Sequence, residues 1–378
     1  MSNLSELIPA GSGAKVAEFV ASGTLPSGQT VALKTDGTVA AVSATGGGEA
    51  VGAESIFEAA ISYYINSAFD SSNNKIVIVY QDGGNSAAGN AVVGTVSGTS
   101  ISFGTPVVFA SGSPGIYWES VVFDSNVNKF VIAYYGNGPG KVRVGTVSGT
   151  SISFGSEAQF NNQNVSYIAL AFDSNANKVV ISYRDDLNSG YGTSLVATVS
   201  GTSISFGSKT VFQSGNSEWI GSTFDSNANK IVITYSNINS SNYGTAIVGT
   251  VSGTSISFGT AVVFEAATSI YTSATFDSNA NKVVVVYRDG GNADSGTAVV
   301  GTVSGTSISF GTPVVFSGDS YFYSAVYNST TNQIIIAFRD DLNSSYGTLI
   351  TGTVSGTSIS FGAKFVFAAK STQQVNAV

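Results

Sequence analysis

The stretch GTVSGTSISFG at residues 94–104 recurs five more times in the 378-residue sequence. Its other copies, one of which starts with Ala, occupy residues 145–155, 197–207, 249–259, 301–311 and 352–362. Successive copies start 51 or 52 residues apart. A fixed period of this length is the sequence signature of a repeat architecture.

A second repeated string keeps the same register. It reads FDSNANK at 172–178, 224–230 and 276–282, and its variants stand at 69–75, 123–129 and 327–333. The two strings together define six units of about 52 residues, which span residues 60–368.

Each unit reads as four strands, and the fifth unit shows the pattern clearly. Tyr271–Phe276 is a short strand, and Asp277–Asn281 is a turn rich in residues that hydrogen-bond their own backbone. Lys282–Tyr287 is apolar on both faces, Thr297–Val303 is a third strand, and Ser307–Phe310 alternates polar and apolar residues. Four-stranded antiparallel units of this length are typical of β-propeller blades, so we predict an all-β propeller.

Residues 49–60 resemble the fourth strand of a blade, although the last repeat already has its own fourth strand. Three further strands are expected at 17–21, 30–35 and 38–43, and Asp36-Gly37 is a strong hairpin signal between the last two. We therefore favour seven blades, one of them divergent. The alternative is six blades plus an N-terminal docking segment.

The expected organisation has four parts. Residues 1–14 are a flexible docking tail, 15–59 a divergent blade, 60–368 six regular blades and 369–378 a C-terminal tail. Because no strand is left over to complete a blade, the ring is expected to close by packing the first blade against the last.

Composition excludes several classes of protein. The chain has no Cys and no His, which removes thiolate chemistry, the Ser-His-Asp triad and ordinary zinc catalysis. Its net charge of −8 argues against a nucleic-acid partner, which needs a basic surface. No apolar run approaches the roughly 18 residues of a membrane helix, so no membrane insertion is expected. We expect no enzyme activity and no cofactor.

Two of the connections in each unit are nearly uniform and two are variable. Strand order places the DSNANK and SGTS turns on one face, and the other loops with the blade-to-blade segments on the opposite face. The variable loops include 83–89, 186–192, 237–244 and 341–347. Because recognition usually resides in loops on a rigid scaffold, the variable face is the expected contact surface. The fourth strand, SGTSISFG, is interpreted as rim solubility.

One aromatic residue per unit lies five positions before the first residue of the FDS motif. These residues are Tyr64, Trp118, Tyr167, Trp219, Tyr271 and Phe322. An odd offset places each on the opposite side of its strand from that motif residue. They are either blade-to-blade packing or a stacking platform for a sugar or a partner loop near the axis.

A polar set of residues follows the second strand of each unit. It consists of Gln81, Tyr135, Arg184, Ser236, Arg288 and Arg339, often with an Asp next in sequence. Arg–Asp pairing between blades is one interpretation, and a rim that binds a glycan or a carboxylate is the other. Together, the six aromatic residues with Arg184, Arg288 and Arg339 form the predicted ligand site.

Two more specific interpretations, a calcium loop and a glycoside hydrolase site, compete with simpler ones. Residues 124–128 have the opening of a calcium loop but lack its Gly and distal Glu, so an Asx turn explains them better and no metal is predicted. A glycoside hydrolase would need paired carboxylates, for which Glu119 and Glu218 are the best candidate acids. No catalytic residue is assigned.

The sequence also resembles repeat proteins of marine tailed bacteriophages. The resemblance rests on residues 1–13, on 20–42, and on the FDSNANKVVVVYRDGGN and GTAVVGTVSGTSISFGTPVVF units at 276–292 and 296–316. It implies a virion component, such as a receptor-binding tail-fibre propeller or a head decoration. Such a protein is assembled in the host cytoplasm and displayed on the particle exterior beside other virion proteins.

Three functions follow from these observations. The first is a non-catalytic virion surface protein that binds a host glycan or protein receptor through the variable face. The second is a purely architectural virion part, and the third is a secreted lectin or carbohydrate-active enzyme.

Overall fold

The computed structural model describes residues 31–33, 39–41, 52–111, 115–136 and 138–378. The chain divides into two compact units, Met1–Gly52 and Ala53–Val378. The described strands of the first unit are β1 (Val31–Leu33) and β2 (Val39–Ala41), which pair antiparallel with Ala32 opposite Ala40. Two antiparallel strands therefore lie within the predicted ranges 30–35 and 38–43, whereas the turn at Asp36-Gly37 lies outside the described residues. The predicted strand at 17–21 and docking tail at 1–14 lie outside the described residues, so the seventh blade stays a prediction.

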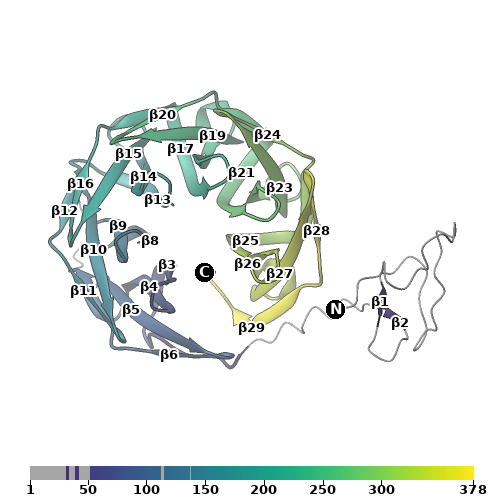
Figure 1. Ribbon diagram of the computed structural model, residues 1–378, viewed down its shortest axis with the longest axis horizontal. Helices are drawn as coiled ribbons and strands as arrows, with labels where there is room; N and C mark the ends of the chain where they lie inside the picture. Colours follow the sequence, from purple (N-terminus) through teal and green to yellow (C-terminus); the bar gives the residue numbers. More distant parts are fainter. Residues whose placement is uncertain (1–30, 34–38, 42–51, 112–114, 137) are drawn as a thin grey trace, which may run out of the picture. The chain divides into compact units, whose positions relative to one another are not determined.

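The second unit is a β-propeller with six four-stranded antiparallel blades among its described residues (Figure 1). The innermost strands are β3 (Ser62–Asp70), β8 (Tyr117–Asp124), β13 (Val165–Asp173), β17 (Thr210–Asp225), β21 (Val262–Asp277) and β25 (Val314–Asn328). The second strands are β4 (Lys75–Asp82), β9 (Lys129–Tyr135), β14 (Lys178–Asp185), β18 (Lys230–Asn237), β22 (Lys282–Asp289) and β26 (Gln333–Asp340). These two sets confirm the predicted repeat of strand, Asx turn and apolar strand.

The third and fourth strands complete each blade. The third strands are β5 (Ala88–Ser97), β10 (Gly140–Ser148), β15 (Tyr191–Ser200), β19 (Tyr243–Ser252), β23 (Ser295–Ser304) and β27 (Tyr346–Ser355). The fourth strands are β6 (Ser100–Phe103), β11 (Ser151–Phe154), β16 (Ser203–Phe206), β20 (Ser255–Phe258), β24 (Ser307–Phe310) and β28 (Ser358–Phe361). Short 3₁₀ turns, η2 (Ile238–Ser240) and η3 (Asp341–Asn343), interrupt two of the variable loops.

The outer edge of each blade continues beyond the fourth strand. Segments β7 (Val107–Ala110), β12 (Ala158–Asn161) and β29 (Phe365–Ser371) pair again with the third strand of their blade. In the other blades this segment is the start of the next innermost strand. The residues Thr210–Asn216 of β17, for example, pair with β15, and Ser217–Asp225 pair with β18. Strands β17, β21 and β25 therefore link neighbouring blades through continuous backbone.

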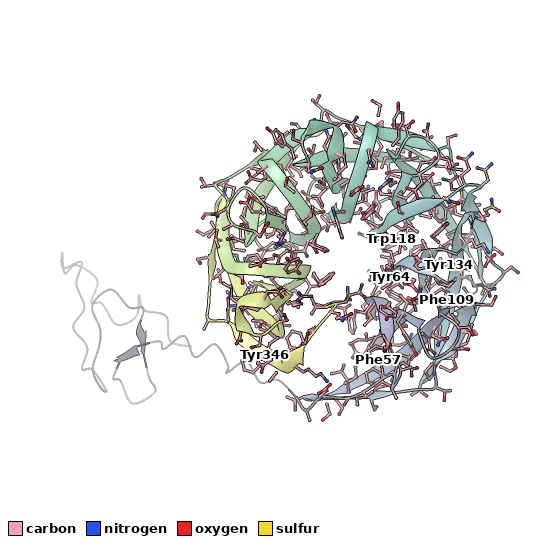
Figure 2. All side chains as sticks on the ribbon, turned by 180° about the vertical axis from the view of Figure 1, so that it is seen from behind. Phe57, Tyr64, Phe109, Trp118, Tyr134 and Tyr346 are labelled. Atoms are coloured by element: carbon pink, nitrogen blue, oxygen red, sulfur yellow. The ribbon has the colours of Figure 1, made fainter. Side chains whose placement is uncertain are left out.

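The core lies between blades, because each second strand is covered on both faces. Val283–Tyr287 of β22 are completely buried, as an apolar strand sandwiched between two layers must be. Outer-edge phenylalanines pack against the next blade: Phe109 contacts Tyr134 and Phe154 with ring centroids 5.2 and 6.0 Å apart. Figure 2 shows Phe109 and Tyr134 beside each other, farther from the axis of the wheel than Tyr64 and Trp118.

The SGTSISFG strings do more than keep the rim soluble, which corrects the sequence interpretation. A Cβ on Gly207 would lie 1.7 Å from the carbonyl oxygen of Thr254 in the next blade. Gly104, Gly155, Gly259 and Gly311 make the same approach to the SGT turn that follows them. Only a residue without a side chain permits this backbone contact, so the repeated glycine is a blade-to-blade joint.

The FDSNANK turns are Asx turns. Oδ1 of Asp225 accepts hydrogen bonds from the backbone amides of Asn227 and Ala228 at 3.0 and 2.8 Å. Asn229 follows with φ of 54°, in the left-handed region that Asn tolerates better than most residues. The carboxylate is thus occupied by its own turn, as the sequence predicted when it favoured this explanation over a calcium loop.

Ring closure uses an element that the sequence did not indicate. C-terminal residues 372–378 reach into the centre of the wheel (Figure 1). The Ile65 amide of the first blade donates to Gln374 Oε1 at 3.2 Å, and Ser67 Oγ donates to Asn376. The Ala377 amide donates to Ser324 Oγ of the last blade at 3.0 Å. The first and last blades are therefore bridged by the tail, rather than joined only by direct packing as expected.

Residues 52–60 form no strand, which corrects the prediction of a fourth strand over 49–60. No described strand pairs with them, and a strand needs such a partner for its backbone groups. Phe57 nevertheless contacts Tyr80 and Phe103, with centroids 5.1 and 5.9 Å apart. It occupies the position on the first blade that Phe109 occupies on the second. Among the described residues, no helix is long and apolar enough to cross a bilayer.

Candidate functional site

The six aromatic residues predicted from the repeat share an unusual backbone conformation. Tyr64, Trp118, Tyr167, Trp219, Tyr271 and Phe322 have φ between 50° and 57°. Each lies where the pairing of the innermost strand with the second strand shifts register, as between Tyr63 and Asn66 in β3. A β-bulge of this kind re-aims a side chain. The left-handed conformation costs roughly 1–2 kcal/mol for each L-residue, so the surrounding structure must hold it.

These bulges bring the aromatic rings into one continuous series near the axis. Neighbouring centroids are 5.7 Å apart for Tyr64 and Trp118, and 4.3 Å for Trp118 and Tyr167. The series continues through Trp219, Tyr271 and Phe322 at 5.2, 4.1 and 4.9 Å. The prediction of an inner aromatic ring is confirmed in its geometry, and blade-to-blade contact is confirmed with it. A binding role stays a prediction.

A cavity of about 230 Å³ opens along this series. Five of the six rings line it, all except Tyr167, and the C-terminal tail supplies one wall through Gln374, Val375 and Asn376. This volume lies below the roughly 300–1,000 Å³ of pockets for drug-sized ligands. A half-buried aromatic lining with a few polar groups fits one sugar ring or one small headgroup.

Glu119 is the charged member of this lining. It follows Trp118 in β8 and is 5% exposed, and neither of its carboxylate oxygens has a hydrogen-bond partner in the part of the chain that the structure describes. Burial raises the pKa of Glu119 well above its ordinary value of 4.5, and its own backbone amide does not offset this effect. A native side chain left in this state requires an explanation, because burying an unpaired polar group is costly.

The polar set lies directly beside the aromatic series. The residue that precedes each aromatic residue is paired in register with the predicted polar residue of the second strand. Examples are Tyr63 with Gln81, Ser166 with Arg184 and Tyr321 with Arg339. Both predicted rings therefore occupy the same end of the strands.

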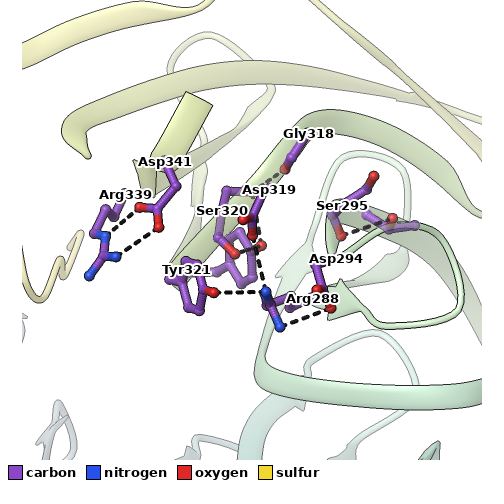
Figure 3. Close-up of polar contacts among 11 residues, drawn as sticks. Arg288, Asp294, Ser295, Gly318, Asp319, Ser320, Tyr321, Arg339 and Asp341 are labelled. Carbon is purple, nitrogen blue, oxygen red and sulfur yellow. Dashed lines mark hydrogen bonds and ion pairs between the residues drawn. The ribbon is translucent and has the colours of Figure 1, made fainter. Parts of the chain in front are cut away.

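Two of the predicted arginines enclose a tyrosine that sequence reasoning did not single out (Figure 3). The guanidinium carbons of Arg288 and Arg339 lie 4.2 and 4.9 Å from the ring centroid of Tyr321. Arg288 also forms ion pairs with Asp294 and Asp319 at 2.9 and 3.1 Å, and its Nη2 donates to the Tyr321 hydroxyl at 2.8 Å. Cation–π contacts of this kind and the ion pairs together orient the guanidinium group.

The ion pairs of Arg339 and Arg184 lie outside the central cavity. Arg339 binds Asp341, and this contact holds the pKa of Asp341 below its ordinary value. Arg184 bridges Asp186 and Glu218 at 3.0 and 2.7 Å. Arg–Asp pairs therefore form, but those of Arg184 with Asp186 and of Arg339 with Asp341 lie within one blade and not between blades as predicted. No arginine lines the central cavity. The predicted site therefore divides into an aromatic pocket and a neighbouring polar rim.

The variable loops surround this end of the molecule. Gly83 and Gly290, in second-to-third loops, donate backbone hydrogen bonds to Ile61 and Thr268 of the blade-to-blade segments at 2.9 and 2.8 Å. On the opposite face, Ser72 Oγ of one Asx turn donates to Asn128 of the next at 2.6 Å. The loops sort into the two faces predicted from strand order.

Sequence reasoning did not predict that the C-terminal tail lines the pocket, and it gave Glu119 no ligand-binding role. Gln374 and Asn376 lie beyond the last repeat, where no copy exists for comparison. Glu119 was considered only as a possible catalytic acid. Its signal was present in the repeats, because the equivalent position is Ile in three other units, at Ile65, Ile168 and Ile220.

No family model matches the sequence, and no curated protein is similar to it. Solved structures share the fold at low identity. A mutant of the Aleuria aurantia lectin in complex with Fucα1-6GlcNAc aligns with a TM-score of 0.51 and 12% identity over 81% of this chain and 97% of that one. The BP39L lectin of Burkholderia pseudomallei gives 0.58 and 12% over 80% and 84%. A Lactobacillus plantarum protein gives 0.59 and 13% over 93% and 96%. These likenesses establish the β-propeller.

Proposed function

We propose that this protein is a non-catalytic carbohydrate-binding propeller, and that it binds a glycan in the central aromatic pocket beneath the variable loops. The observation that carries the proposal is the left-handed backbone at all six aromatic residues. Packing alone does not require a strained bulge six times over, whereas presenting ring faces to a ligand does. Sugars stack their apolar faces on such rings while their hydroxyls bond to polar groups at the edge.

Two further observations support a carbohydrate ligand. The polar rim of Arg184, Arg288 and Arg339 adjoins the pocket and offers oriented donors to hydroxyl or carboxylate groups. Two of the propellers with the same fold are described as lectins, and one of them binds Fucα1-6GlcNAc. The glycan specificity of this chain is not transferred from either.

We further propose that the glycan belongs to a bacterial host surface and that the protein is displayed on the exterior of a tailed-phage particle. The support is the sequence resemblance to phage repeat proteins. A chain with few charges, no Cys and one Met also suits an exposed particle component, since it offers little to oxidation.

A glycan array with the purified protein tests the proposal. We expect binding to a subset of glycans, and loss of that binding in Tyr64→Ala and Trp219→Ala. Phe69→Ala is the matched control, because Phe69 lies in the same strand as Tyr64 and is 44% exposed at the Asx-turn end. Equal binding by Tyr64→Ala and wild type would overturn the assignment of the pocket.

A purely architectural role is the second candidate, and one observation favours it. Leu187 and Leu342, in two of the variable loops, are 66% and 73% exposed. Exposed leucines at loop tips suit contact with a protein surface. A silent array, together with burial of both leucines in a map of the assembled particle, would favour this role.

A further inference from the structure

The position of Glu119 is Ile in three of the six blades. Its equivalents are Ile65, Ile168, Ile220, Thr272 and Tyr323. Ile168 and Ile220 are 8% exposed and pack into the cores between blades. The second blade therefore places a carboxyl group in a seam that other blades fill with hydrocarbon. Nothing in blade packing requires the substitution.

Among the described residues, no cation forms an ion pair with Glu119. The three arginines nearest the aromatic series are committed to other carboxylates: Arg184 to Glu218, Arg288 to Asp319 and Arg339 to Asp341. No other residue lining the cavity carries a formal charge at neutral pH. The carboxyl group is thus a buried acceptor pair with no partner in the described structure, and Glu119 is one of the residues that line the cavity.

The rest of the wall favours positive charge. Tyr64, Trp118, Trp219 and Tyr271 line the same cavity, and aromatic rings attract organic cations, with Trp the strongest. Desolvation inside a cavity strengthens this attraction. A neutral sugar hydroxyl would use one oxygen of Glu119, whereas an ammonium group would satisfy the charge and the aromatic faces together.

We infer that the central pocket recognises an ammonium group, with Glu119 as its counter-ion, and that the glycan carries a free amine. The part of this inference that concerns an amino sugar rests on the proposed function, whereas the part that concerns an ammonium group does not. The chemical class is a hexosamine whose nitrogen is not acetylated. Acetylation removes the positive charge and adds bulk, so the pocket discriminates between the two forms.

Binding is coupled to a proton. Burial raises the pKa of Glu119 and so favours its protonated form, whereas a cation paired with the carboxylate favours release of this proton to solvent. Affinity for a permanent cation therefore rises with pH up to the pKa of Glu119. The other titratable groups lining the cavity, Tyr64, Tyr271 and Tyr323, have pKa values raised above 10 by burial, and the chain has no His. They do not titrate between pH 5 and 8.

Intrinsic fluorescence gives a readout specific to this pocket. The chain has two Trp residues, Trp118 and Trp219, and both line the cavity. The probes are tetramethylammonium chloride, with sodium chloride at equal ionic strength as the control, and the matched sugars D-glucosamine, N-acetyl-D-glucosamine and D-glucose. We expect tetramethylammonium and D-glucosamine to change the emission, with D-glucosamine binding at least about tenfold more tightly than either neutral sugar.

Two variants separate charge from packing. Glu119→Gln keeps the shape of the side chain, and Glu119→Ile copies the residue of neighbouring blades. Both should lose about tenfold or more in affinity for tetramethylammonium and lose the rise in affinity with pH. Unchanged affinity in Glu119→Gln, or no response of the wild type to tetramethylammonium, would overturn the inference. If neutral sugars bind as well as D-glucosamine, the inference fails while the proposed function stands. If tetramethylammonium binds but no glycan does, the proposed function fails while the ammonium site stands.

Discussion

At the scale of single residues, the side-chain contacts of the aromatic series offset the cost of its left-handed backbone. Each of the six residues pays for a left-handed φ, and each gains contacts with its neighbours of roughly 0.5–1.5 kcal/mol. The two effects are similar in size, so stability alone does not select this arrangement. Under the proposed function, a ligand that stacks on the rings does.

The strain can be measured by removing the side chain in two ways. Trp219→Ala and Trp219→Gly both lose the indole, but Gly adopts φ near 52° without penalty. We expect Trp219→Gly to be more stable than Trp219→Ala by about 1 kcal/mol in urea denaturation. The reverse order, which is usual within a strand because Gly costs chain entropy, would contradict the left-handed conformation.

Glu119 should make stability depend on pH. Because the folded pKa is raised above 4.5, the folded state binds more protons than the unfolded state between the two values. The contribution of Glu119 to the free energy of unfolding is therefore greatest below pH 4.5, and it falls as pH rises toward the folded pKa. Urea denaturation of wild type and Glu119→Gln at pH 4.5 and 7.5 measures the difference. We expect the variant to gain stability relative to wild type at the higher pH, and no gain would contradict the burial of an unpaired carboxyl.

At the scale of elements, the blades are joined at the rim by backbone contact. Gly207→Ala forces a methyl group onto the Thr254 carbonyl, so we expect a loss of about 1–3 kcal/mol in the free energy of unfolding. Gly201→Asn is the control, because Gly201 has φ of 62° and open space around its Cα. Asn tolerates this conformation, and its cost should stay below about 1 kcal/mol. Equal losses in the two variants would contradict a joint at Gly207.

Much of this level could be predicted from sequence. The period, the Asx turns and the doubly buried second strands follow from residue patterns that local chemistry determines. The bulges could not be predicted, because an aromatic residue in a bulge has the same sequence context as one in a regular strand. The odd offset from the FDS motif assumed regular alternation, which the shift between Tyr63 and Asn66 interrupts. The aromatic ring was found, but the conformation that aims it was not.

At the scale of the whole molecule, ring closure depends on residues that no repeat copy could reveal. Three hydrogen bonds, from Ile65, Ser67 and Ala377, connect the C-terminal tail with the first and last blades. Their net contribution is about 1 kcal/mol each. The same tail supplies a wall of the pocket, so the residues that close the ring also complete the site.

Removal of residues 372–378 tests this coupling. We expect the free energy of unfolding to fall by about 3 kcal/mol and the pocket to lose affinity for any glycan identified on the array. A full-length chain with Gln374→Gly and Asn376→Ser separates the side chains from the mere presence of a tail. Unchanged stability and affinity after truncation would show that the blades close the ring without the tail.

The central claim is that sugar rings stack on the aromatic residues at the axis. Saturation-transfer NMR with selective irradiation of aromatic protons measures this directly for a saccharide that the array identifies. The account predicts strong transfer to the protons of one sugar ring, retained in Phe69→Ala and abolished in Trp219→Ala. Binding with no transfer from aromatic protons, or transfer that survives Trp219→Ala and Tyr64→Ala, would place the glycan elsewhere and contradict the account.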